Sequence, residues 1–155
     1  MLEVSLPGTI ALAVMGALAA WRDGTQRRLP NGLSLACALV GLAFGFAAGG
    51  AGQAGSALLH ALASLLVGMA LYRFGWIGAG DAKFYAACAA WFPLSHAVTL
   101  LSSVSLAGLV LVLAWFALGQ VRRSLGDGRG GSFALLPYGI AIALGAVIAR
   151  LVSAG

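Results

Sequence analysis

The stretch HAVTLLSSVSLAGLVLVLAWFAL, residues 96–118, contains no Asp, Glu, Lys or Arg and is dominated by Leu, Val and Ala. An α-helix needs about 20 consecutive apolar residues to cross the hydrocarbon core of a bilayer. This stretch is long enough, and a helix satisfies all of its backbone groups within the segment, as lipid requires. We therefore expect a membrane-spanning helix over this range.

The composition of the whole chain agrees with that expectation. Of its 155 residues, 61% are hydrophobic and 8% are charged, whereas a soluble domain is about 25% charged. This leaves too little polar surface to face water on all sides. The net charge of +5 does not indicate a nucleic-acid-binding protein, because the basic residues are spread through apolar sequence and form no continuous basic face. We expect an integral membrane protein.

Other apolar stretches follow along the chain, separated by short polar or glycine-rich segments. They predict an all-α integral membrane protein, a bundle of six transmembrane helices that forms a single membrane-embedded domain over residues 1–155. Helix boundaries inferred from sequence carry errors of about 2–4 residues. The expected helices cover residues 4–20, 32–48, 56–72, 82–92, 96–118 and 133–151.

The charged residues are distributed unevenly between the connections of these helices. The odd-numbered connections are basic, whereas GGAGQAGS (49–56) and PLSH (93–96) contain no Lys or Arg. By the positive-inside rule the basic connections lie in the cytoplasm, so both termini are expected on the non-cytoplasmic side. Arg150 is the exception, and at a helix end it can snorkel to the membrane surface. The charged residues of the basic connections are Arg22, Asp23, Arg27, Arg28, Arg73, Asp81, Lys83, Arg122, Arg123, Asp127 and Arg129.

The expected helix at residues 82–92 is short for a full crossing, because Pro93 limits it. Either the helix begins within the preceding GAGD, residues 78–81, or Asp81 lies slightly below the membrane surface. Both alternatives put a carboxylate near the boundary between water and lipid.

Asp23 and Asp81 both lie on the cytoplasmic side of this topology, after the first helix and before the fourth. Folding of the bundle can bring them together. Two carboxyl groups that share a site can act as base and acid, because like charge raises one pKa. This is the chemistry of aspartic proteolysis. Since the helix dipole favours an anion at a helix N-terminus, we expect Asp81 to ionise first and Asp23 to keep the shared proton.

Simpler interpretations of these residues remain open. Asp81 can serve only as the N-cap of the fourth helix, and Asp23 only as a loop residue paired with Arg22 or Arg27. Asp127, which lies between glycines, is expected to be a solvated loop residue. Carboxylates within membranes also mark ion pathways, so a small proton-coupled transporter is an alternative function.

The remaining candidate residues indicate no cofactor and no metal site. Cys37 and Cys88 form no CxxC pair and are expected to be small buried residues. His60 and His96 have no second histidine or acid at ligand spacing. The tryptophans lie near expected helix ends, as in an aromatic belt; they are Trp21, Trp76, Trp91 and Trp115.

Gly78 and Gly80 precede Asp81 in the stretch GAGDAK, residues 78–83. Glycine permits positive φ angles and close approach of another group to the backbone. We therefore expect a turn beside which an extended substrate can pair with the backbone.

Three motifs together resemble those of the type IV prepilin peptidase family. GAGDAK (78–83) matches the GxGDxK signature of that family. DGTQRRLPN (23–31) is similar to its first-aspartate motif, and LLPYGIAIALGA (135–146) resembles the Pro-Tyr-Gly segment that opens its last helix. The three motifs occur in the family's order and span nearly the whole chain.

The resemblance implies a GxGD-type aspartic endopeptidase of the bacterial inner membrane. Such an enzyme cleaves the leader peptide of type IV prepilins at the cytoplasmic face, with Asp23 and Asp81 as the catalytic pair. The implied partners are the helix and leader of a prepilin, the lipid bilayer, and a pilus or secretion assembly system. The residues implied to support the active site are Gly78, Gly80, Lys83, Arg27, Pro30 and Asn31.

The chain departs from the longer members of that family, which carry an N-terminal domain with paired cysteines and also N-methylate the new terminus. It begins at its first expected helix and has no CxxC pair. The resemblance is thus to the short form of tight-adherence (Flp) pilus systems, and it implies cleavage without methylation. Archaeal preflagellin peptidases share the aspartates and remain an alternative for the class of substrate.

Overall fold

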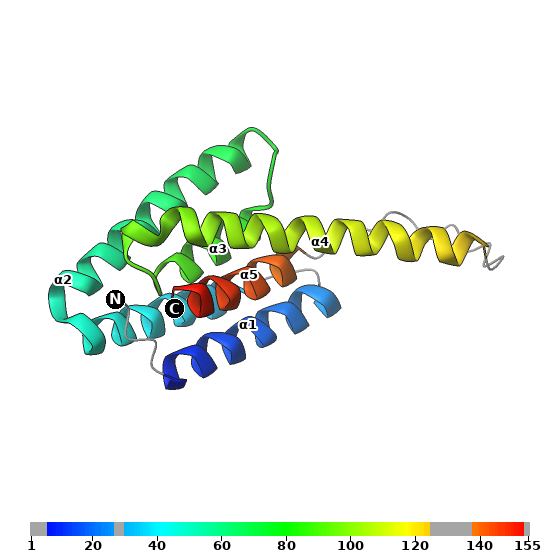
Figure 1. The fold of residues 1–155 in the computed structure, drawn as a ribbon. Helices are drawn as coiled ribbons and strands as arrows, with labels where there is room; N and C mark the ends of the chain where they lie inside the picture. The colour runs from blue at the N-terminus through cyan, green and yellow to red at the C-terminus, as the bar shows by residue number, and fades with distance from the viewer. Residues whose placement is uncertain (1–5, 27–29, 125–137, 154–155) are drawn as a thin grey trace.

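The computed structural model describes residues 6–26, 30–124 and 138–153, and all regular structure in these ranges is helical. This confirms the prediction of an all-α protein. Figure 1 shows a bundle of helices from which one end of α4 projects. The elements are α1 (Leu6–Gln26), α2 (Asn31–Arg73), α3 (Ala79–Ala89), the short 3-10 helix η1 (Leu94–His96), α4 (Ala97–Ser124) and α5 (Tyr138–Val152).

α2 covers two of the predicted helices and the connection between them. Its backbone is non-helical at Gly49 and Gly50, where the chain changes direction (Figure 1). Gly50 has a φ of 65°, a value that glycine adopts without the steric cost of a side chain. The predicted connection 49–56 is therefore reduced to a bend of two residues, because residues 51–56 are helical.

The helices extend beyond the apolar stretches that predicted them. α1 ends at Gln26 rather than near Ala20, and α4 also continues past its predicted end. Hydropathy marks the part of a helix that suits lipid, whereas polar residues remain good helix formers outside it. Asp23 consequently lies on the last turns of α1, and the prediction that it lies in a connection after the helix is wrong.

α1 and α5 lie side by side and antiparallel, while α3 packs against α2 and α5 (Figure 1). Glycines let these helices approach closely. A Cβ atom added to Gly16 of α1 would lie 3.1 Å from Cβ of Ala143 in α5, and one added to Gly41 of α2 would lie 2.6 Å from the Trp91 ring. Small residues at such contacts are typical of helices that associate within lipid.

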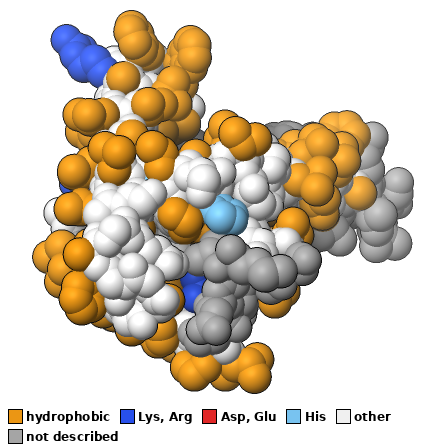
Figure 2. Space-filling view, turned by 60° about the vertical axis from the view of Figure 1, so that its left-hand side comes forward, with side chains coloured by type: hydrophobic (Ala, Val, Ile, Leu, Met, Phe, Trp, Pro, Cys, Tyr) orange, Lys and Arg blue, Asp and Glu red, His pale blue; other side chains and the backbone are white. Residues whose placement is uncertain are grey.

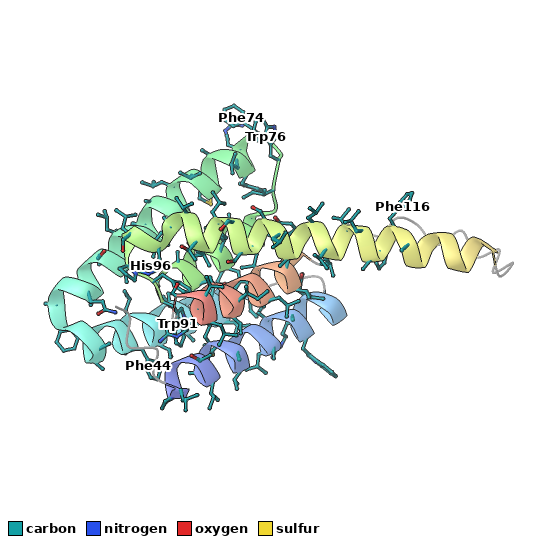
Figure 3. All side chains as sticks on the ribbon, viewed as in Figure 1. Phe44, Phe74, Trp76, Trp91, His96 and Phe116 are labelled. Atoms are coloured by element: carbon teal, nitrogen blue, oxygen red, sulfur yellow. The ribbon has the colours of Figure 1, made fainter. Side chains whose placement is uncertain are left out.

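The outer surface of the bundle is largely apolar. Hydrophobic side chains cover much of the face in Figure 2, and few charged side chains interrupt them. Among the described residues, Asn31–Arg73 and Leu94–Ala117 are long and apolar enough to cross a membrane, and Tyr138–Val152 is a shorter apolar helix. On α4, Val98 and Phe116 are 77% and 61% exposed (Figure 3). So extensive an apolar surface indicates association with a membrane.

The segment just beyond α3 is buried and is capped by side chains from two other helices. Nδ1 of His60 in α2 donates to the carbonyl oxygen of Phe92 over 3.1 Å, and a guanidinium N–H of Arg150 in α5 donates to that of Trp91 over 3.3 Å. Carbonyl groups at a helix C-terminus lack partners within the helix, and a cationic donor there is favourable. The prediction that Arg150 snorkels to the surface is therefore wrong, since it is only 4% exposed.

Trp91 is likewise a core residue, 3% exposed, and the prediction that it belongs to an aromatic belt is wrong. Its indole N–H donates to the carbonyl oxygen of Cys37 over 3.0 Å, and its ring stacks on Phe44 with 5.6 Å between centroids (Figure 3). Cys37 and Cys88 are both buried, as predicted. These contacts fix the C-terminal end of α3 in the bundle and thereby the position of its other end, where Asp81 lies.

Candidate active site

Four helix ends meet at the end of the bundle opposite the bend in α2 (Figure 1). α1 ends there, and α2, α3 and α5 begin there. Three interactions connect these ends: Asp23 with Gly139, Lys83 with Asn31, and Asp23 with Asp81. The fold therefore brings the two predicted catalytic residues into one region with two of the predicted supporting residues.

Asp81 is the third residue of α3 rather than its N-cap. The helix begins at Ala79, and its N-cap is Gly78, whose backbone is extended (φ −74°, ψ 146°). The carboxylate of Asp81 accepts a hydrogen bond from the backbone N–H of Gly78. An acidic side chain at the third helical position can reach back to the N-cap in this way. Of the two alternatives for this segment, the one in which the helix begins within GAGD is confirmed.

The glycines before Asp81 allow a close approach rather than a left-handed backbone. A Cβ atom at Gly78 would lie 2.9 Å from Oδ2 of Asp81, so a larger residue would displace the carboxylate. Gly80 lies within α3, and among the described glycines φ is positive at Gly50 and Gly75. Gly78 and Gly80 therefore do not use the positive φ that glycine permits, and the close approach of the carboxylate is what requires glycine at residue 78.

Asp23 reaches from the C-terminal end of α1 to the first turn of α5. Its Oδ2 accepts a hydrogen bond from the backbone N–H of Gly139 over 3.0 Å. N–H groups in the first turn of a helix have no partner within the helix, so the carboxylate satisfies one of them. The interpretation of Asp23 as a loop residue paired with Arg22 or Arg27 does not account for this contact with α5. Arg27 lies outside the described residues.

The charge of Asp23 acts on the carboxyl group of Asp81. Burial raises the pKa of Asp81 above the ordinary value of an aspartate, the negative charge of Asp23 raises it further, and the N–H of Gly78 lowers it. Interaction between charges weakens with distance and with solvent screening, so this effect requires that the two groups be near each other. Burial and the neighbouring charge thus favour the protonated form of Asp81, opposite to the effect expected there from the helix dipole. The order in which the two groups ionise stays a prediction.

Asp81→Asn is expected to stabilise the protein at neutral pH. A carboxyl whose pKa is raised in the folded state stabilises the fold below its unfolded pKa, and that contribution is lost as the pH rises through the folded pKa. Asparagine keeps an acceptor for the N–H of Gly78 but carries no charge. We expect the variant to melt a few degrees higher than the unaltered protein at about pH 7. The difference should vanish near pH 4, about the ordinary pKa of an aspartate.

Thermal unfolding in lipid nanodiscs between these two pH values measures this effect. Asp127→Asn is the matched control, because the sequence predicts a solvated carboxylate at that position. A melting temperature that rises equally at both pH values, or that falls at neutral pH, would contradict the explanation by burial.

The predicted supporting residues form a contact of their own. Nζ of Lys83 donates to Oδ1 of Asn31 over 3.1 Å, which joins the fifth residue of α3 to the first residue of α2. Pro30 is the N-cap of α2, with φ −66°. Lys83 and Asn31 thus hold together two of the helix starts that surround the carboxyl groups.

Gly139 is absent from the residues that the sequence predicted for the site. A signal for it exists, because the stretch LLPYGIAIALGA places a glycine at the start of the last apolar run. Its contact with Asp23 joins residues 116 positions apart in the sequence. Such a contact follows from the packing of α1 on α5, which the motif alone does not specify.

The described residues offer no set of metal ligands. In the ranges 6–26, 30–124 and 138–153, no three side chains of His, Cys, Asp or Glu gather as a metal site would require. Among the described residues of this region, Asp23 and Asp81 supply carboxyl groups, which can transfer a proton between a water molecule and a substrate.

Comparison with known proteins gives a match at the level of the family. The model of the type IV leader peptidase family matches residues 10–113. This range includes Asp23, Asp81, Asn31 and Lys83, whereas α5 with Gly139 lies outside it. No curated protein and no solved structure matches the chain.

Proposed function

Because the chain belongs to the type IV leader peptidase family, whose model matches residues 10–113, we propose that it is an aspartic endopeptidase that removes the leader of type IV prepilins. The family match establishes a peptidase of the leader-peptidase type. The aspartic mechanism rests on one observation: Asp23 and Asp81 lie at adjoining helix ends, near enough for the charge of Asp23 to raise the pKa of Asp81. Like charges held close together favour a pair that shares one proton.

The proposed reaction uses Asp23 as the base and Asp81 as the acid. Asp23 accepts a proton from a water molecule as the water oxygen bonds to the carbonyl carbon of the scissile peptide. Asp81 donates its proton to the carbonyl oxygen, which gives a neutral tetrahedral intermediate. The C–N bond then breaks, the leaving nitrogen takes the proton from Asp23, and a hydroxyl proton returns to Asp81. Both carboxyl groups end in their starting forms.

This division of roles follows from the surroundings of each group. Burial and the neighbouring charge raise the pKa of Asp81, which suits a proton donor near neutral pH. The backbone N–H of Gly139 donates to Oδ2 of Asp23. The other carboxylate oxygen can then accept the proton of the water molecule. A pH–rate profile would report two apparent ionisations that belong to the pair.

We propose six membrane spans, formed by the apolar parts of α1, of the two arms of α2, of the segment from α3 to η1, of α4 and of α5. Asp23 and Asp81 would lie outside them, at the cytoplasmic ends of α1 and α3. Arg22 and Lys83 lie near the helix ends around the carboxyl groups, which supports a cytoplasmic location for this end by the positive-inside rule. Both termini would lie on the opposite side. The protein would reside in the bacterial inner membrane.

A prepilin suits this arrangement. The apolar helix of a prepilin can lie in the bilayer against the apolar outer surface of the bundle, and its leader junction then lies at the level of the carboxyl groups. Proteolysis requires an extended segment, because a helix shields its peptide bonds. We favour a Flp-type prepilin as the substrate and a pilus or secretion assembly system as the partner, with archaeal preflagellins as the alternative substrate class.

Cleavage by the purified protein in proteoliposomes tests this function. We expect mass spectrometry to show a single cut in a Flp-type precursor, between the leader and the apolar helix. The matched control is the same precursor with a scrambled leader junction, which should remain intact. Failure to cut Flp-type, other type IV and preflagellin precursors alike, under conditions in which the protein is folded, would contradict the proposal.

A further inference from the structure

The N-terminus of α5 contacts Asp23, the proposed base. α5 lies outside residues 10–113, the range that the family model matches. The backbone N–H of Gly139 donates to Oδ2 of Asp23 over 3.0 Å. Gly139 is buried in the first turn of α5. The donor is thus one of the N–H groups that a helix leaves without an internal partner, and the helix dipole adds to its attraction for a carboxylate.

Position 139 requires glycine because a side chain would collide with Asp23, and not because the backbone has a positive φ. A Cβ atom at residue 139 would lie 2.7 Å from Oδ2 of Asp23, 3.2 Å from its Cγ and 3.3 Å from its Cβ. The Asp23 side chain from Cβ to Oδ2 therefore lies against the place that a Cβ atom of residue 139 would occupy. With any other residue, the carboxyl would have to turn away from the N–H that it accepts.

We propose that Gly139 is a positioning residue for the reaction. Its N–H occupies Oδ2 of Asp23 and fixes the rotation of the carboxyl group, which leaves Oδ1 as the oxygen that faces the water and Asp81. This inference rests on the proposed role of Asp23 as the base. It extends that role to α5, so that the last helix contributes to catalysis through the orientation of a side chain on the first.

Gly139→Ala tests the inference, because loss of positioning should lower kcat and leave KM nearly unchanged. The nearest atoms to the added Cβ belong to the end of a side chain, which can move, so the fold should be kept. We expect kcat for prepilin cleavage to fall about 10- to 100-fold, because a shift of about 1 Å in a catalytic group can cost that much. KM should change by less than about twofold, since substrate binding is unaltered.

Gly16→Ala is the matched control on the same pair of helices. A Cβ atom there would lie 3.1 Å from Cβ of Ala143, so the substitution crowds the α1–α5 contact away from the carboxyl groups. We expect Gly16→Ala to lower the melting temperature and to keep kcat per folded molecule. If both variants lose activity only in proportion to the folded protein, or if Gly139→Ala keeps its kcat, the positioning role is overturned.

Two further variants separate the possible failures. Asp23→Asn in the same assay tests the proposed function: if it remains active, that function fails, whereas an inactive Asp23→Asn with a fully active Gly139→Ala refutes only the positioning role. If Gly139→Ala does not fold, the Asp23→Ala/Gly139→Ala double variant decides. Folding of the double variant supports the contact, because the side chain that the Cβ would strike is gone, and failure to fold overturns it.

Discussion

Asp23→Asn and Asp81→Asn are each expected to lower the rate constant of leader cleavage by about 10³-fold or more. Asparagine has the shape of aspartate, so the helix ends and the substrate contacts should be kept. It can neither take a proton from water nor give one to the carbonyl oxygen, and such acid–base steps contribute about 10²–10⁴-fold. Single-turnover cleavage in proteoliposomes measures this rate constant without the contribution of product release.

The double variant should be no slower than the slower of the two single variants, because groups that act as one unit have non-additive effects. Asp127→Asn is the matched control, since it makes the same exchange at the acid that the sequence predicts to be a solvated loop residue. Its rate should stay within about twofold of the unaltered protein, as for most surface substitutions. Cleavage at the unaltered rate by either single variant would show that these carboxyls are not the catalytic pair.

Gly145→Ala is expected to destabilise the bundle. A Cβ atom on this residue of α5 would collide with Cα of Val104 in α4 and lie 2.7 Å from its backbone nitrogen. A backbone cannot turn aside as a side chain does, so the two helices would have to separate. Overpacking costs about 1–3 kcal/mol, and each kcal/mol lowers the melting temperature by about 2–4 °C for a chain of this size. The better helix propensity of alanine offsets up to about 1 kcal/mol.

Gly55→Ala makes the same exchange without the collision. Gly55 lies in the helical part of α2, and nothing lies within 4 Å of a Cβ atom placed there. Alanine restricts the unfolded chain and favours the helix, so this control should raise the melting temperature. Opposite shifts for the two variants in nanodiscs would support close packing of α4 on α5. A Gly145→Ala protein as stable as Gly55→Ala would contradict it.

The helical class and the approximate ranges could be predicted because lipid imposes long apolar stretches on the sequence. The ends of the helices could not, since hydropathy responds to lipid and not to helix formation. Asp23 therefore lies on α1 instead of in a connection. For the same reason GGAGQAGS suggested a connection between two helices, whereas only Gly49 and Gly50 leave the helix.

The sequence did not predict which side chains make contacts between helices that are remote in the chain. Arg150 looks like a surface cation at a helix end, yet it caps the carbonyl group of Trp91 inside the bundle. The raised pKa of Asp81 was not expected, because its main cause is burial, which depends on packing. The motifs identified the two carboxyls, but the reason for a glycine at position 139 becomes visible only when α5 lies against Asp23.

The separation of the two carboxyl groups with substrate bound tests the central claim most directly. It can be measured in an experimental structure of the Asp81→Asn protein in lipid with an uncleaved prepilin. We predict that the side chains of residues 23 and 81 both lie within about 3 Å of one water or of the scissile carbonyl group, as shared catalysis requires. Side chains that stay more than twice as far from the scissile bond, or that face opposite sides of the membrane, would contradict the account.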